Sequence, residues 1–173
     1  MRRPILVAAL ALTLTACSSP ASREAMTPQL LAIDKHHPYS LRVQTNGGSE
    51  TGGLDSTNIA DADLKAAIEN AVIRNRVFKS VIQGGGGDYE LNVQVISLRR
   101  PMIGVTLDVE LEMGWSLVRS SDRTVLMRKS VQSTGQAGIG DAIAFVTRLQ
   151  LAVEMAARNN IAEGLKAISK LKL

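Results

Sequence analysis

Aromatic side chains are scarce in this chain, where they make up 3% of 173 residues. Proteins that bind single-stranded nucleic acid stack the bases on aromatic rings, so this scarcity argues against such a platform. The formal net charge of +4 does not by itself indicate nucleic acid binding. Two of the basic residues, Arg2 and Arg3, lie in a segment that we expect to be removed, which leaves 18 basic against 16 acidic residues. We therefore expect no nucleic acid partner.

Cysteine and histidine are almost absent as well. Cys17 is the only cysteine, so the chain has no internal disulfide and must be held together by packing. His36 and His37 are adjacent in a stretch that contains proline, and we interpret both as solvated linker residues. A serine nucleophile would then lack a histidine base within the domain, and no cluster of side chains has metal-ligand spacing. We expect neither a metal nor another cofactor.

The first sixteen residues carry the clearest signal in the chain. Arg2 and Arg3 precede an apolar run, Ile5 to Leu14, and then the stretch Leu14-Thr15-Ala16-Cys17. A charged start, a short apolar run and small residues before a cleavage site are typical of an export signal, here residues 1–16. The run is about half of the ~20 residues that a membrane-spanning helix needs.

The stretch that ends at Cys17 resembles the lipobox of bacterial lipoproteins. In that family the cysteine becomes acylated, which implies a membrane anchor at Cys17 of this chain. Two or more acyl chains give stable anchoring where one gives only marginal binding. Ser18 follows the cysteine. In the Gram-negative lipoproteins that the chain resembles, serine at this position is compatible with transfer to the outer membrane, so we expect an anchored protein that faces the periplasm.

After the cleavage site we expect a lipidated tether over residues 17–38 and one α+β domain over residues 39–173. Alternation of apolar and polar residues predicts strands over 39–45, 89–98, 105–117 and 124–134, with a change of parity near Ile96 that suggests a bulge. Apolar residues at steps of three and four predict helices from Asp61 to about Asn75 and from Asp141 to Lys170, each capped by its first aspartate. The predicted order is β-α-β-β-β-α: one mostly antiparallel four-stranded sheet with two helices on one face.

The turn after the strand at 89–98 is the most plausible contact site. Arg99 and Arg100 stand beside Met102 and Ile103, close to the start of the longest predicted strand. Arginine next to exposed apolar residues suits an anionic lipid headgroup or a partner protein. A solvated turn is the alternative interpretation.

A row of acidic residues leaves room for an enzyme. Asp108, Glu110 and Glu112 share one face of a strand and would serve as acid and base if a deep pocket bordered them. The solvated side of a sheet explains the same row. The four glycines at Gly84–Gly87 follow a helix and precede a strand, the reverse of a phosphate-binding loop, so we interpret them as a connector.

Two families of envelope lipoproteins resemble this chain. The stretch Asp88–Val93, followed by Trp115-Ser116-Leu117, is similar to the auxiliary lipoprotein subunit of ABC-type envelope lipid-transport systems. The predicted element order behind a lipidated cysteine resembles the lipoprotein plug of the outer-membrane lipopolysaccharide translocon. These resemblances imply a non-catalytic binding or accessory protein in outer-membrane assembly or envelope lipid transport, with an envelope protein as partner. The alternatives are an envelope hydrolase or acyl-transfer enzyme that uses acidic residues, and a homo-oligomer joined through sheet edges.

Overall fold

The computed structural model describes residues 21–48 and 58–173. The expected signal peptide (1–16), the expected lipidation site Cys17 and the neighbouring Ser18 lie outside the described residues. In chain order the elements are α1 (Arg23–Met26), β1 (His37–Asn46), α2 (Asp61–Arg74), β2 (Phe78–Val81), β3 (Tyr89–Arg99), β4 (Leu107–Arg119), β5 (Val125–Ala137) and α3 (Phe145–Ser169).

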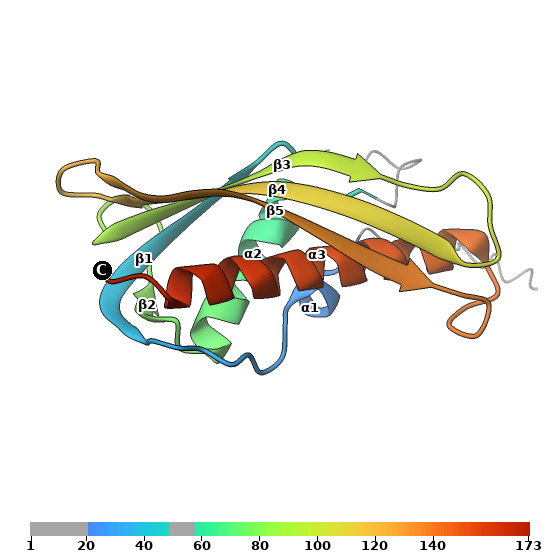
Figure 1. The fold of residues 1–173 in the computed structure, drawn as a ribbon, viewed down its shortest axis with the longest axis horizontal. Coiled ribbons are helices and arrows are strands. Elements are labelled where there is room, and N and C mark those ends of the chain that lie inside the picture. The colour runs from blue at the N-terminus through green and yellow to red at the C-terminus, as the bar shows by residue number, and fades with distance from the viewer. Residues whose placement is uncertain (1–20, 49–57) are drawn as a thin grey trace, which may run out of the picture.

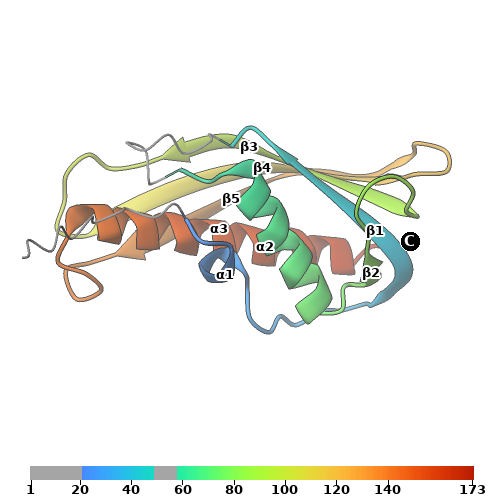
Figure 2. The ribbon, with the colours of Figure 1, turned by 180° about the vertical axis from the view of Figure 1, so that it is seen from behind.

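The strands form one sheet in the order β2-β1-β3-β4-β5. β1 is parallel to both of its neighbours, whereas β3, β4 and β5 form an antiparallel meander. All three helices lie on one side of this sheet (Figures 1 and 2). α3 runs along β4 and β5 for most of the length of the molecule, and α2 covers β1 and β2.

The alternating sequence of β4 sets the two faces of the sheet. Its odd-numbered residues from Leu107 to Leu117 point into the core and are at most 1% exposed, while Asp108 and Glu110 point to solvent. The parity change near Ile96 is confirmed as a register shift between Val95 and Ser97. A second shift, between Leu117 and Val118, leaves Val125 46% exposed, although the pattern predicts that it faces the core.

Two glycines let α3 lie unusually close to the sheet. A methyl group at Gly135 of β5 would overlap the backbone of Ala152 and Ala156, and one at Gly164 of α3 would overlap the ring of Trp115. Trp115 is 1% exposed, as expected for a core residue. Gly164 therefore provides room for the indole, and this close approach explains its presence within a helix.

One side chain joins this helix to the sheet by hydrogen bonds. Asn160 of α3 is fully buried, accepts from Nε1 of Trp115 at 3.0 Å and donates to the carbonyl of Val131 at 2.8 Å. Its amide group thus pairs with both β4 and β5. A buried polar group is tolerated here because its donor and acceptor are satisfied.

The predicted α+β class is confirmed, and two details of the sheet differ from the prediction. The sheet has five strands, because Phe78–Val81 forms a short β2 that pairs with β1. It is also mixed, since β1 runs parallel to β2 and β3. Four residues are too few for alternation to be visible in a sequence, and strand order is set by packing between distant segments.

The two aspartates that we expect to cap helices instead accept hydrogen bonds from backbone amides outside the helices. Ala60 and Ala144 precede α2 and α3, and neither helix has a side-chain cap. The carboxylate of Asp61 accepts from the backbone amide of Gly48 at 2.9 Å. That of Asp141 accepts from the amide of Gly138 at 2.8 Å, inside the loop before α3. Both side chains stabilise loops, and α3 begins four residues later than predicted.

Candidate functional site

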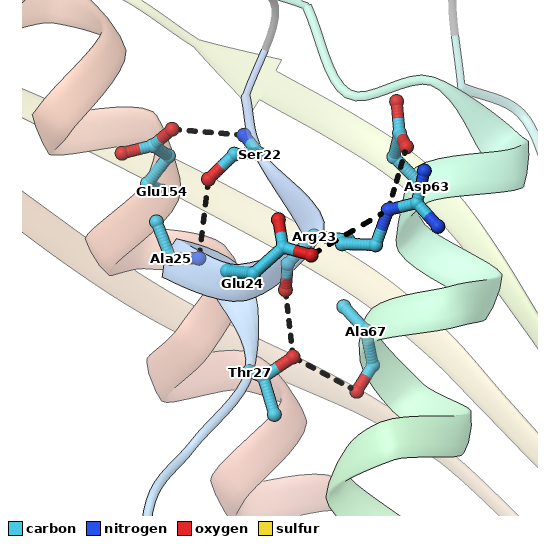
Figure 3. Close-up of polar contacts among 8 residues, drawn as sticks. All are labelled: Ser22, Arg23, Glu24, Ala25, Thr27, Asp63, Ala67 and Glu154. Carbon is cyan, nitrogen blue, oxygen red and sulfur yellow. Dashed lines mark hydrogen bonds and ion pairs between the residues drawn. The ribbon is translucent and has the colours of Figure 1, made fainter.

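The segment expected to be a lipidated tether is packed against the domain from its first described residue. Ala21 and Met26 are fully buried. α1 lies in the space between α2 and α3 (Figure 3). The backbone amide of Ser22 donates to the carboxylate of Glu154 on α3 at 2.8 Å, while the Ser22 hydroxyl caps α1 by accepting from the amide of Ala25 at 3.2 Å.

The other side of α1 contacts α2. Arg23 lies 3.8 Å from the carboxylate of Asp63, and the hydroxyl of Thr27 donates to the carbonyl of Arg23 at 2.6 Å and faces the carbonyl of Ala67 (Figure 3). Farther on, the amide of Leu31 donates to Asn75 at 2.7 Å. The chain from residue 21 to β1 therefore forms part of the domain, and only residues 17–20 of the expected tether lie outside the described residues.

His37 differs from its expected role as a solvated linker residue. It begins β1, is 5% exposed, and its Nε2 lies 3.2 Å from the carbonyl of Ile168 near the end of α3. Burial lowers the pKa of His37 below its usual value, an effect that the Ile168 carbonyl partly opposes and that Lys35 and His36 reinforce. His36 is exposed, with Nδ1 2.7 Å from the carbonyl of Arg76.

The turn proposed from sequence as a contact site lies at one end of the elongated molecule, where a second loop joins it (Figures 1 and 2). The β3–β4 loop carries Met102 and Ile103, which are 91% and 87% exposed. The loop between β5 and α3 carries Ile143, which is 90% exposed. Less exposed apolar side chains of the same two loops and of the first turn of α3 complete this surface, which we call the apolar tip: Met102, Ile103, Val105, Ile139, Ile143 and Val146.

A contact between the first turn of α3 and the β3–β4 loop lies within the apolar tip. Arg148 in the first turn of α3 is 7% exposed and places Nη2 3.5 Å from the carbonyl of Gly104. Its Nε has no hydrogen-bond partner in the described part of the chain. Gly104 adopts a φ of +152°, and a side chain there would overlap the carbonyl of Thr106. This position therefore requires glycine, and the loop shape that exposes Ile103 depends on it.

Charges of both signs surround the apolar tip. Arg99 is 77% exposed in its side chain and lies 3.7 Å from the carboxylate of Glu110, and Arg100 is also exposed. Asp108 accepts from Gln136 at 2.7 Å. α3 has no acidic residue in its first turn, so the positive end of its dipole is not offset there.

The acidic row on β4 borders an open hollow of about 380 Å³. Glu110 forms one wall, with a side chain that is 64% exposed, and Glu112 accepts from the hydroxyl of Ser130 at 2.6 Å. The Glu110 side chain is thus largely in solvent, whereas Glu112 is partly buried. Arg42 of β1 lies 3.6 Å from Glu90 of the neighbouring strand β3.

The described residues contain no group of three or more histidine, cysteine or acidic side chains placed to hold a metal ion. Among the helices of residues 21–48 and 58–173, none combines the length and apolar character required to cross a membrane. The sheet ends in β2 on one side and in β5 on the other, and α3 partly covers β5: Asn159 donates to the carbonyl of Thr134 at 2.8 Å, next to the Asn160 contact with Val131.

Sequence comparison assigns no family: no family model and no curated protein match the chain. Solved structures share its fold. A Xanthomonas campestris protein of family DUF330 has a TM-score of 0.60 at 13% identity, over 79% of this chain and 88% of that one. A PelC dodecamer from Paraburkholderia phytofirmans has a TM-score of 0.53 at 19% identity, over 83% and 92%. A minor lipoprotein of Acinetobacter baumannii has a TM-score of 0.50 at 9% identity, over 75% and 91%.

At these identities the comparisons establish the fold alone. The fold is one that bacterial proteins use, including one that is named as a lipoprotein. It neither selects one of the two lipoprotein families that the sequence resembles nor assigns a reaction.

Proposed function

We propose that this chain is a lipid-anchored accessory protein of the bacterial envelope that faces the periplasm and acts by binding. The observation that carries the proposal is the position of the packed N-terminal segment. Cys17 stands four residues before Ala21, which is fully buried against the domain. An acylated Cys17 therefore holds the whole domain close to the membrane surface.

The membrane assigned to this anchor is the outer membrane. Ser18 follows the cysteine in the sequence, and serine at that position suits transfer to the outer membrane in the lipoproteins that the chain resembles. The fold shared with a lipoprotein of Acinetobacter baumannii supports an envelope role. The resemblance of Asp88–Val93 and Trp115–Leu117 to transport-system lipoproteins directs the proposal toward envelope lipid transport or outer-membrane assembly.

Binding fits the described surface better than catalysis does. The acidic row lines an open hollow, and Glu110 is already paired with Arg99. The apolar tip is the surface that stands out, because its exposed aliphatic side chains contribute nothing to the core. Scattered exposed apolar residues are ordinary, but a group drawn from two loops at one end of a molecule is typical of an interaction site. We assign partner or lipid binding to the tip and to the adjacent Arg99 and Arg100.

Membrane fractionation of a Cys17→Ser variant tests the anchor. Without the thiol nothing can be acylated, so the variant should remain uncleaved or appear in the soluble fraction. Cells that produce the wild-type chain provide the matched control, and labelling with a radioactive fatty acid should mark only the wild type. A Cys17→Ser variant that sediments with the outer membrane as the wild type does would refute the lipoprotein assignment.

Self-assembly is a second candidate function. The fold is shared with PelC, which is named as a dodecamer, and the outer strand β5 is thirteen residues long. Asn159 and Asn160 occupy the carbonyls of Thr134 and Val131, so edge pairing between copies is favoured in the segment before Val131. Light scattering of the purified protein distinguishes the states: a monomer at all concentrations would exclude this candidate.

A further inference from the structure

We propose that the apolar tip inserts into the same lipid bilayer that holds the Cys17 anchor, so that the domain is attached to the membrane at two points. The inference rests on the proposed acylation of Cys17 and names the lipid surface as the partner of the tip. The tip presents three side chains that are nearly as exposed as in a free peptide: Met102, Ile103 and Ile143. They come from two loops that the fold places at one end (Figures 1 and 2).

The length of chain between the anchor and the domain allows both attachments together. Ser22 is held at Glu154, nine residues along α3 from Phe145. At ~1.5 Å of rise per residue, this attachment lies about 14 Å along the helix from the end that carries the tip. Cys17 precedes Ala21 by four residues, which span at most ~14 Å when extended. The two lengths match, so acyl chains on Cys17 can enter the bilayer at the level of the tip.

The chemistry of the tip suits the boundary between lipid chains and headgroups. Aliphatic side chains gain from leaving water, while arginine side chains at the same depth reach the headgroup phosphates. Arg99 and Arg100 lie beside the tip, and Arg148 lies beneath it at the positive end of α3. Three acidic side chains near the tip make contacts within the protein: Asp108 accepts from Gln136, Asp141 accepts from the amide of Gly138, and Glu110 pairs with Arg99, which would exchange this carboxylate for a phosphate on insertion.

Insertion of the tip fixes the orientation of the domain. α3 begins at the tip and ends at Ser169, so its 25 residues extend ~37 Å away from the bilayer. The polar outer face of the sheet and the hairpin between β4 and β5 then remain in the periplasm, accessible to other envelope proteins. An anchor at Cys17 alone would be a single point of attachment and would not fix this orientation.

Fluorescent labelling of the anchored protein tests insertion. Cys17 is the only natural cysteine and is blocked by acylation, so a new cysteine is the only reactive thiol. We would place an environment-sensitive fluorophore at Met102→Cys, at Ile143→Cys and, as the control, at Gln132→Cys on the exposed outer face of β5. The full-length lipidated protein is reconstituted in phosphatidylcholine vesicles, with and without phosphatidylglycerol, and lipids that carry a spin label serve as quenchers.

The expected result is blue-shifted, lipid-quenched emission at positions 102 and 143 and water-like emission at 132. Water-like emission at 102 and 143 in protein that sediments with the vesicles would refute tip insertion while leaving the anchor intact. Loss of sedimentation would instead refute the anchor. A blue shift at 102 or 143 without vesicles would mean that a second copy covers the tip, which also overturns the proposal.

A substitution measures how strongly the tip contributes. Replacing Ile143 with serine should lower the ratio of inserted to free tip about tenfold. Burial of an isoleucine side chain favours insertion by at least that factor. Ile73→Ser is the matched control, because Ile73 on α2 is 60% exposed and lies outside the tip. An equal change in both variants would count against insertion.

Discussion

Replacing Gly164 with alanine tests the close packing of α3 on the sheet, because two effects of opposite sign compete there. In a solvated helix this substitution stabilises by about 1 kcal/mol, since glycine is a poor helix former. At position 164 the new methyl group would lie 2.5 Å from Cζ2 and 2.6 Å from Cδ2 of Trp115. Distances below 3.0 Å are not tolerated, so either the indole or the helix must shift.

The indole has little freedom to move. Trp115 is 1% exposed and its Nε1 donates to Asn160, so a rotation would break a buried hydrogen bond as well as disturb the packing. Overpacking a core costs about 1–3 kcal/mol, and the overlap with several ring atoms places this case near the upper end. After the gain in helix propensity is subtracted, we expect a net loss of about 2 kcal/mol. In a domain of this size that corresponds to a fall in Tm of about 4–8 °C.

Thermal and urea unfolding of the domain, residues 21–173, measure the change in the free energy of unfolding. Gly85→Ala is the control, because a methyl group there meets no atom within 4 Å and its φ is not positive. That variant should change stability by no more than about 0.5 kcal/mol or increase it slightly. In a Trp115→Leu background, Gly164→Ala should lose most of its cost, which a double-mutant cycle would reveal as coupling. A Gly164→Ala variant with a raised Tm would refute the close approach of helix and indole.

Three further changes probe the core, the pH response and the tip. Trp115→Ala should cost about 3–5 kcal/mol, and the native protein should show blue-shifted tryptophan emission; a red, water-like spectrum would contradict burial. Burial lowers the pKa of His37 in the folded state, so the unfolded state is protonated at this residue first as the pH falls below about 6.5. The free energy of unfolding should therefore decrease between pH 6.5 and the lowered pKa of the folded state. His37→Gln should abolish that step in urea titrations at several pH values, and an unchanged profile would assign it to another group. Arg99→Glu with Arg100→Glu should weaken binding to anionic vesicles yet shift unfolding by at most about 1 kcal/mol, whereas unchanged vesicle binding, measured by sedimentation, would exclude a role in lipid contact.

Local periodicity predicted the parts of the fold that are long and half buried. β4 alternates from Leu107 to Leu117, and α2 begins at Asp61 as its apolar spacing indicates. The bulge after Val95 was visible because the apolar parity changes at Ile96. In each case one element buries one face, and the sequence records that face directly.

The parts that were missed depend on contacts between distant segments. α1 has only four residues and no periodicity, and it is stabilised by Ser22 and Met26 contacts with helices that follow much later. His37 resembled a linker residue because distant segments bury it: its ring packs against Phe78 of β2 and its Nε2 faces the carbonyl of Ile168 near the end of α3. Asp61 and Asp141 occupy positions typical of helix caps, but nearby loop amides compete successfully for their carboxylates.

The sequence predicted one of the two loops that form the apolar tip. Met102 and Ile103 were identified because they are apolar residues in a turn that needs none. Ile139 and Ile143 were missed, since they lie some forty residues away in a glycine-containing loop and only the fold brings the two loops together. Apolar residues between Gly135 and the start of α3 that fit no helical face were the available signal.

The packed N-terminal segment gives the domain a defined response to mechanical load. A pulling force on an anchored Cys17 acts first on the Ser22–Glu154 hydrogen bond and on the burial of Met26, and it reaches β1 only after α1 has detached. When the later contacts, such as that of Leu31 with Asn75, also break, the sixteen residues from Ala21 to His36 are free and extend to about 55 Å. With the proposed anchor at Cys17, the domain would move that far from the membrane under tension while its sheet stays folded, and it would return when α1 packs again between α2 and α3.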